Sequence, residues 1–233
     1  MCGRFSITTP PEAMREIFNY ENIPNLQPRF NVAPTQPIIT IRRLENNRRA
    51  LIMNRWGLIP SWSKDGGSAA RMINARAETL LEKPSFREAF RTRRCLIPAD
   101  SFYEWRVEGQ KRQPFRVGLK GGTLFAFAGL WESWQAKHKG NGYEEGDIVE
   151  TAVIVTTEAN DKLRPIHNRM PVIMPTELYS FWLDPANDVS SCHNYLKPYP
   201  SEPMAFYRVS TFVNNVKNDD LRCIEPLSRV RRA

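Results

Sequence analysis

The chain has 233 residues, of which 41% are hydrophobic and 11% aromatic, and this composition predicts a folded globule rather than a disordered segment. Its apolar runs are shorter than the roughly 18 residues of a membrane span, and the N-terminus lacks the basic-then-apolar order of a signal peptide. The formal charge of +8, from 33 Lys and Arg against 25 Asp and Glu, favours a polyanionic partner. We therefore expect a cytoplasmic protein with no membrane partner.

The first half of the chain is predicted to mix short helices with strands. A proline-led segment with apolar residues at helical spacing predicts a helix that Thr9 caps, followed by a Pro- and Asn-rich loop. Two runs rich in β-branched residues predict strands, and a loop with a glycine pair separates them from a second helix that is broken near Pro84. These elements cover residues 9–20, 36–43, 49–59, 60–70 and 77–94.

The second half is dominated by strands. Four strand-like runs follow one another closely, and a Gly-containing hairpin at 108–112 joins the second to the third. A Gly-rich loop, a β-branched run, a proline-led helix and a last strand complete the chain. These elements cover residues 94–100, 102–109, 113–119, 123–134, 136–147, 151–159, 175–183 and 204–210.

The balance of elements predicts the fold class. Strands outnumber helices and do not alternate with them, which indicates an α+β protein with mainly antiparallel sheets rather than a doubly wound parallel sheet. No change in composition divides the sequence, so we expect one domain over residues 1–233, ending in a flexible basic tail at about 228–233.

The cysteines give no sign of a disulfide framework or a metal site. Cys2, Cys95, Cys192 and Cys223 are widely scattered and form no C-x-x-C pair, so we expect reduced thiols. Cys192 and His193 are adjacent, and neighbouring side chains point apart, so this pair does not predict zinc binding. We expect no metal and no cofactor.

Cys2 directly follows the initiator methionine. Removal of Met1 gives a residue with a free α-amine and a thiol on adjacent carbons, which no internal cysteine has. The amine can form an imine with an aldehyde, and the thiol can then add to the same carbon and close a thiazolidine ring. Because the unperturbed pKa values are about 7.7–8.0 for the amine and about 8.5 for the thiol, we expect an acid–base pair nearby.

Two residues are candidates for the acid–base pair. His167 follows a proline in a turn beside an apolar run. Strand alternation places Glu104 on the face of Phe102 and away from Tyr103 and Trp105, where burial would raise the pKa of the carboxyl and suit a general acid. A structural histidine and an exposed glutamate on an edge strand are the alternatives.

Three further residues could bind a substrate. In INARAET (73–79), Asn74 and Arg76 project to one face of an extended chain. The asparagine can orient a group without titrating, and the arginine can hold a phosphate. Trp62, in a loop after a proline, can stack on a base or insert into a gap in a strand. Turn formation, a surface ion pair and a cap on the core are the structural alternatives.

Six sequence blocks are specific when taken together. They are CGRF (2–5), FNVAPTQ (30–36), RWGLIPSW (55–62), INARAET (73–79), RCLIPADSFYEW (94–105) and IHNRMPVIM (166–174). In this order and spacing the chain resembles the SRAP (SOS response-associated peptidase) family, proteins that recognise abasic sites and are associated with the SOS response. The resemblance runs from residue 2 to about residue 217, and it implies an irregular barrel-like core with flanking helices.

The resemblance also implies a function and a set of site residues. The function is covalent capture of abasic sites in single-stranded DNA, through a thiazolidine that protects the lesion. The implied catalytic residues are Cys2 as nucleophile, Asn74 to orient the amine and the sugar, Glu104 to move protons, and His167 to assist ring opening and reversal. The implied DNA contacts are Arg4, Trp62, Arg76, Trp105 and Arg169. We expect a monomer that associates with the nucleoid when bound to DNA.

Two other functions stay open from the sequence. Cys2, His167 and Glu104 could form the nucleophile, base and orienting group of a thiol peptidase or amidohydrolase. Removal of Met1 by an aminopeptidase makes self-cleavage unnecessary for exposing Cys2. Alternatively, the protein could be a non-catalytic module for single-stranded DNA, in which Trp62 and the arginines act alone. Each function has its own test. Capture of an abasic site requires an aldehyde and Cys2, a peptidase is acylated by a peptide without DNA, and a binding module binds DNA equally well without Cys2.

Overall fold

The computed structural model describes residues 2–22, 24–67 and 69–227, and the predicted basic tail lies outside these ranges. The α-helices are α1 Pro11–Phe18, α2 Pro84–Thr92, α3 Tyr179–Leu183 and α4 Val189–His193. The strands are β1 Phe5–Ile7, β2 Arg29–Val32, β3 Pro37–Arg43, β4 Arg49–Trp56, β5 Asn74–Arg76, β6 Arg94–Ala99, β7 Ser101–Glu108, β8 Lys111–Leu119, β9 Phe125–Gln135, β10 Ile148–Glu158, β11 Arg169–Pro171, β12 Ile173–Met174 and β13 Met204–Arg208. The 3₁₀-helices are η1 Ala69–Arg71, η2 Ala77–Thr79, η3 Lys120–Gly122, η4 Thr176–Leu178, η5 Thr211–Asn214 and η6 Leu221–Cys223.

One sheet closes into a barrel. Its strands run in the order β11-β10-β4-β3-β6-β9-β12, and β9 also pairs with β10, so β10, β4, β3, β6 and β9 form a closed ring. β5 pairs in parallel with β10 at residues 154–156, beyond the residues of β10 that pair with β4. Closure leaves these five strands without the unpaired edges of an open sheet.

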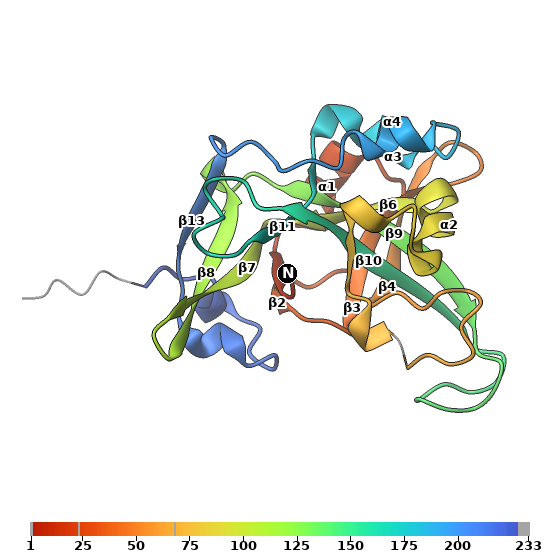
Figure 1. The fold of residues 1–233 in the computed structure, drawn as a ribbon, viewed down its shortest axis with the longest axis horizontal. Coiled ribbons are helices and arrows are strands. Elements are labelled where there is room, and N and C mark those ends of the chain that lie inside the picture. Colours follow the sequence, from red (N-terminus) through yellow and green to blue (C-terminus); the bar gives the residue numbers. More distant parts are fainter. Residues whose placement is uncertain (1, 23, 68, 228–233) are drawn as a thin grey trace, which may run out of the picture.

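The second sheet has the order β13-β8-β7-β1-β2 and is antiparallel throughout. Figure 1 shows β7, β8 and β13 on one side of the view and the barrel strands on the other, with the N-terminal segment between them. Among the described strands, parallel pairing is confined to β10 with β4 and β5. The predicted α+β fold with mainly antiparallel sheets and a barrel-like core is therefore confirmed.

Aromatic side chains fix β1 against the barrel. The ring of Phe5 lies 5.2 Å from that of Trp56 in β4 and 5.8 Å from that of Phe127 in β9. Phe102 of β7 lies 6.0 Å from the same Phe127 ring. Such edge-to-face pairs add about 0.5–1.5 kcal/mol to the effect of the area they bury. The chain that leads to Cys2 is thus held between the two sheets.

The helices cover the barrel. Figure 1 shows α1, α3 and α4 together along one side of the barrel strands. α2 lies beside β9. α1 buries Met14 and Phe18, and the ring of Phe18 stacks on Tyr179 of α3 at 5.3 Å. No helix in the described part of the chain is long and apolar enough to cross a membrane.

Most predicted elements are confirmed with bounds that differ by a few residues, and two predictions are wrong. The second helix is indeed broken, because α2 begins at Pro84 after η2. Thr9 does not cap α1: Pro10 occupies the cap position, and the Thr9 hydroxyl donates to Asp100 at 2.5 Å. β2 lies in what was predicted to be a Pro- and Asn-rich loop, because four residues are too few for strand alternation to be recognised.

Gly57, directly after β4, is expected to be essential for stability. Its φ is +129°, and a Cβ there would lie 2.3 Å from the carbonyl oxygen of Ala69. Because the atoms that this Cβ would meet belong to the backbone of Ala69 and cannot rotate away, we expect Gly57→Ala to lower the free energy of unfolding by about 2–4 kcal/mol.

The matched control is Gly109→Ala in the hairpin between β7 and β8. Gly109 also has a positive φ, +62°, but nothing lies within 4 Å of an added Cβ. We expect a loss of about 1 kcal/mol, from backbone conformation alone. Urea unfolding measures both variants, and equal losses would contradict the assignment of a clash at Gly57.

Candidate active site

Cys2 is placed at the junction between the two sheets. β1 pairs with β7, and the amide of Tyr103 donates to the carbonyl of Arg4 at 2.9 Å, so residues 2–4 run along β7 toward Glu104. The Cys2 side chain is fully buried, and its Sγ lies 3.9 Å from the carbonyl oxygen of Arg4. The predicted nucleophile therefore lies within the folded core.

Asn74 connects Cys2 to the barrel. It is the first residue of β5 and lies opposite Ile154 of β10. Its Nδ2 donates to the carbonyl oxygen of Cys2 at 2.8 Å. Its Oδ1 is buried and accepts no hydrogen bond from the described residues. Because an unsatisfied buried acceptor costs about 1–3 kcal/mol, this oxygen is suited to a donor that the reaction brings, such as the α-amine of Cys2.

Glu104 is a buried acid beside Cys2. It lies in β7, the central strand of its sheet, and its side chain is 2% exposed. Burial raises the pKa of the Glu104 carboxyl to about 7. The alternative of an exposed glutamate on an edge strand is therefore wrong, and the predicted raised pKa is present.

The thiol of Cys2 is held in its protonated form. Burial raises the pKa of the thiol far above its ordinary value, and the charge of Glu104 raises it further. A low dielectric disfavours both anions, so the thiol keeps its proton at neutral pH and the carboxyl releases its own only as the pH approaches 7. This environment differs from that of an activated thiolate, which needs a nearby positive charge.

His167 is placed at the same end of β10 as Asn74. It precedes β11, which pairs with residues 156–158 of β10, next to the residues that pair with β5. Its Nδ1 lies 3.0 Å from the amide nitrogen and 3.1 Å from the carbonyl oxygen of Arg169, and these contacts fix the ring. Burial lowers the pKa of His167, and the Arg169 guanidinium lowers it further.

Two predicted DNA contacts are exposed. Arg76, at the end of β5, points to solvent, while its neighbour Ala75 is buried, as the alternation predicts. Trp62 is 60% exposed. It lines a depression of about 470 Å³ against α2, together with Ser85 and Arg87. This depression is separate from the junction that holds Cys2.

The other three predicted contacts are bound within the protein. Arg169 forms a two-pronged ion pair with Glu78, at 2.6 and 3.0 Å. The Arg4 guanidinium donates to Asn31 and to two backbone carbonyls, and the Trp105 indole donates to Asn214 at 2.8 Å. All three side chains are therefore oriented by contacts within the protein.

The sequence assigned no role to Asn31, Glu78 or Asp219. Asn31 binds Arg4 and Glu78 binds Arg169, while Asp219 accepts from the backbone of β2. Asn31 and Glu78 lie inside FNVAPTQ and INARAET, so membership of these blocks was the one available signal.

All four cysteines are free thiols. No cluster of three or more metal-binding side chains occurs in the residues that the structure describes.

Comparison with known proteins identifies the family. Residues 1–216 match the family model described as SOS response associated peptidase (SRAP), and the chain belongs to this family. It is 45% identical over 230 residues to the abasic site processing protein YoqW of Bacillus subtilis (strain 168), with 97% of this chain and 99% of that protein covered. It is 31% identical over 231 residues to the abasic site processing protein HMCES of Gallus gallus, with 86% and 67% covered. A crystal structure of a Bacteroides thetaiotaomicron protein matches it with a TM-score of 0.85 at 26% identity, covering 97% of this chain and 100% of that one.

The buried carboxyl of Glu104 is expected to make stability fall as the pH rises. Its pKa is about 7 in the folded protein, against about 4.3 in an unfolded chain, so its favourable contribution is complete below pH 4 and is lost as the pH passes through 7. Relative to wild type, Glu104→Gln should gain on the order of 3 kcal/mol between pH 4 and pH 8.

Urea unfolding of both proteins at a series of pH values measures this difference. Glu88→Gln, at an exposed position of α2, is the control for removing a carboxylate in general. A difference between Glu104→Gln and wild type that does not change with pH would contradict a raised pKa at Glu104.

Proposed function

We propose that this protein captures abasic sites in single-stranded DNA through a covalent thiazolidine at Cys2, after removal of Met1. The observation that carries the proposal is the hydrogen bond from Asn74 to Cys2 beside the buried Glu104. The names of the relatives, abasic site processing proteins, support the same substrate. A ring-opened abasic sugar has the aldehyde that an N-terminal cysteine needs.

The first step forms an imine. The α-amine of Cys2 attacks the aldehyde carbon, and the oxygen leaves as water once it has been protonated. A carboxyl with a pKa of about 7 can supply that proton and can also take one from the amine, so Glu104 serves as acid and base. The Oδ1 of Asn74 accepts from the amine and directs its lone pair. His167, neutral because its pKa is lowered, takes part in opening the sugar ring.

The second step closes the ring. The sulfur of Cys2 bonds to the imine carbon, the C=N bond becomes a C–N bond, and the thiol proton passes to the nitrogen. Atoms and electrons balance without an oxidant or a metal. Because the thiol holds its proton at neutral pH, the amine reacts first and the sulfur second. Reversal follows the same path, with Glu104 and His167 returning the protons.

DNA binding rests on charge and on aromatic side chains. The net charge of +8 attracts the phosphate backbone, and binding of this kind weakens as salt rises. A missing base leaves only backbone and stacking to recognise, so little sequence preference is expected. The proposed contacts are Arg4, Trp62, Arg76, Trp105 and Arg169, on a monomer that is bound to nucleoid DNA in the cytoplasm.

The surroundings of the thiol argue against a peptidase. A thiol peptidase uses a thiolate that a neighbouring cation stabilises. Here burial and Glu104 both raise the pKa of the Cys2 thiol. A simple DNA-binding module, in turn, has no use for a buried carboxyl beside the N-terminal residue. Aldehyde capture uses both features.

A denaturing gel and intact-mass analysis test the proposal directly. Mature protein with Cys2 verified as the first residue is incubated with a single-stranded oligonucleotide that carries one abasic site. We expect a heat-stable adduct of protein plus oligonucleotide mass. Cys2→Ser keeps the amine without the thiol, so it should give an imine that borohydride traps but no heat-stable adduct.

Two controls define the chemistry. An N-terminal extension that keeps the nitrogen of Cys2 in an amide should abolish both products. An oligonucleotide with a tetrahydrofuran in place of the abasic sugar has no aldehyde and should also give none. If verified wild-type protein forms no adduct, the proposed function is wrong, and peptide and ester substrates become the next test.

Glu104 is expected to control the rate of adduct formation. Glu104→Gln keeps the shape of the side chain but cannot transfer a proton, so the single-turnover rate at saturating DNA should fall about 10²- to 10⁴-fold. The loss of rate above pH 7 that ionisation of Glu104 causes should disappear in the variant. A rate and a pH profile equal to those of wild type would exclude Glu104 from the proton transfers.

A further inference from the structure

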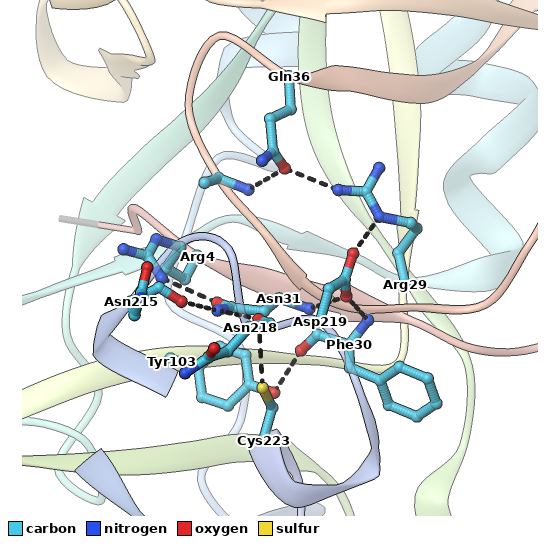
Figure 2. Close-up of polar contacts among 11 residues, drawn as sticks. Arg4, Arg29, Phe30, Asn31, Gln36, Tyr103, Asn215, Asn218, Asp219 and Cys223 are labelled. Atoms are coloured by element: carbon cyan, nitrogen blue, oxygen red, sulfur yellow. Dashed lines mark hydrogen bonds and ion pairs between the residues drawn. The ribbon is translucent and has the colours of Figure 1, made fainter. Parts of the chain in front are cut away.

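The side chain of Asn31 is the centre of a polar network beside the candidate active site (Figure 2). Asn31 is fully buried in β2, and its Oδ1 accepts from Nη1 of Arg4 at 2.8 Å. Its Nδ2 donates to the carbonyls of Val213, Asn215 and Asn218, at 3.1, 3.1 and 2.7 Å. One amide therefore ties Arg4 to a segment about 210 residues further along the chain.

The segment 211–219 depends on polar contacts for its position. Val213 is its one buried side chain, in a stretch that the structure describes throughout. Asp219 fixes the far end, because its Oδ1 accepts from the backbone amides of Phe30 and Asn31 at 2.5 and 2.9 Å. With so little apolar burial, loss of the Asn31 contacts is expected to release the segment.

The same segment holds two of the proposed DNA contacts. Arg4 donates to the carbonyls of Val213 and Asn214, at 2.8 and 3.2 Å. The indole of Trp105 donates to the Oδ1 of Asn214 at 2.8 Å, and the Arg4 guanidinium lies 6.0 Å from the Trp105 ring. Arg4 is two residues from Cys2, so the direction of its guanidinium affects how a DNA strand reaches the proposed nucleophile.

Asn31 orients Arg4 without neutralising it. The acceptors around the guanidinium are an amide oxygen and two backbone carbonyls, which are neutral. Arg4 takes part in no ion pair among the described residues, whereas Arg29, on the same strand as Asn31, is paired with Asp219. The positive charge of Arg4 therefore remains for a phosphate, held in one direction.

We propose that Asn31 is a positioning residue for DNA binding, which holds the Arg4 guanidinium and the segment 213–218 in the geometry that receives the backbone of the abasic strand. The inference rests on the proposed function for its ligand. Asn31 itself does not touch the DNA or the reacting atoms.

The test is the affinity for a single-stranded oligonucleotide with a tetrahydrofuran site, measured by fluorescence anisotropy over a range of salt. Asn31→Asp replaces the neutral acceptor by a carboxylate and removes the three donated bonds. We expect roughly tenfold weaker binding and a salt slope smaller by about 0.7, the value for one phosphate contact on a single strand. Arg4→Ala should show a similar loss, and Asn31→Asp should cost clearly less affinity in the Arg4→Ala background than in wild type, because only the hold on Trp105 through Asn214 remains to be lost.

Reaction with formaldehyde separates positioning from damage to the site. Thiazolidine formation by this small aldehyde needs no DNA contact, so its rate should be the same in Asn31→Asp and wild type. Asn54→Asp, at a buried position of β4, is the matched control for a new buried carboxylate and should keep wild-type affinity. If Asn31→Asp does not fold, Asn214→Ala, at an exposed position, cuts the bond to Trp105 and should weaken DNA binding several-fold.

The outcomes are distinguishable. Unchanged affinity and salt slope in Asn31→Asp, or additive losses with Arg4→Ala, would overturn the positioning role, as would wild-type protein that does not bind the oligonucleotide. Salt-sensitive binding without a covalent adduct on abasic DNA would instead remove the proposed chemistry and leave the role of Asn31 supported.

Discussion

The hydrogen bond from the side-chain amide of Asn74 to the carbonyl of Cys2 joins the two sheets at the point where the chemistry is proposed. β1 belongs to the antiparallel sheet, through its pairing with β7 and β2, whereas β5 belongs to the barrel through β10. Glu104 comes from the first sheet, and His167 precedes a strand of the second. The distances between the proposed nucleophile, acid and base therefore depend on the packing between the sheets, and in the proposed mechanism small shifts there would carry large costs in rate.

Burial gives this site its chemical character. The same apolar surroundings that fix β1 raise the pKa of the Cys2 thiol and of the Glu104 carboxyl. A protonated thiol is a poor starting point for acyl transfer, but condensation with an aldehyde begins at the amine and needs an acid. The raised pKa of Glu104 lowers stability as the pH rises through 7, and in the proposed mechanism the same shift supplies a proton donor beside Cys2.

The sequence predicted the parts of this fold that repeat a pattern over many residues. β3, β4 and the strands from β6 to β10 have alternating or continuous apolar runs, and each was found. β1, β2 and β5 have three or four residues, too few for a pattern, although they position Cys2, Asn31 and Asn74. Alternation placed Glu104 on the face of Phe102, but its burial follows from the pairing of β1 with β7. The contacts of Asn31 with residues 213–218 span more than 180 residues and leave no local signal.

Asn74 and Asn31 each orient another residue in the proposals above. In both cases the side chain is a neutral amide, where a carboxylate would change the charge of the residue that it orients. Asn74 holds Cys2 and presents a neutral acceptor to the amine, so it does not stabilise the unreactive ammonium form as a carboxylate would. Asn31 holds Arg4 and leaves its charge unpaired. Apart from Glu104, the carboxylates named here form ion pairs with other arginines: Asp219 pairs with Arg29, and Glu78 pairs with Arg169. In the proposed mechanism, the two orienting side chains are therefore neutral, while Glu104 transfers protons and Arg4 keeps its charge for a phosphate.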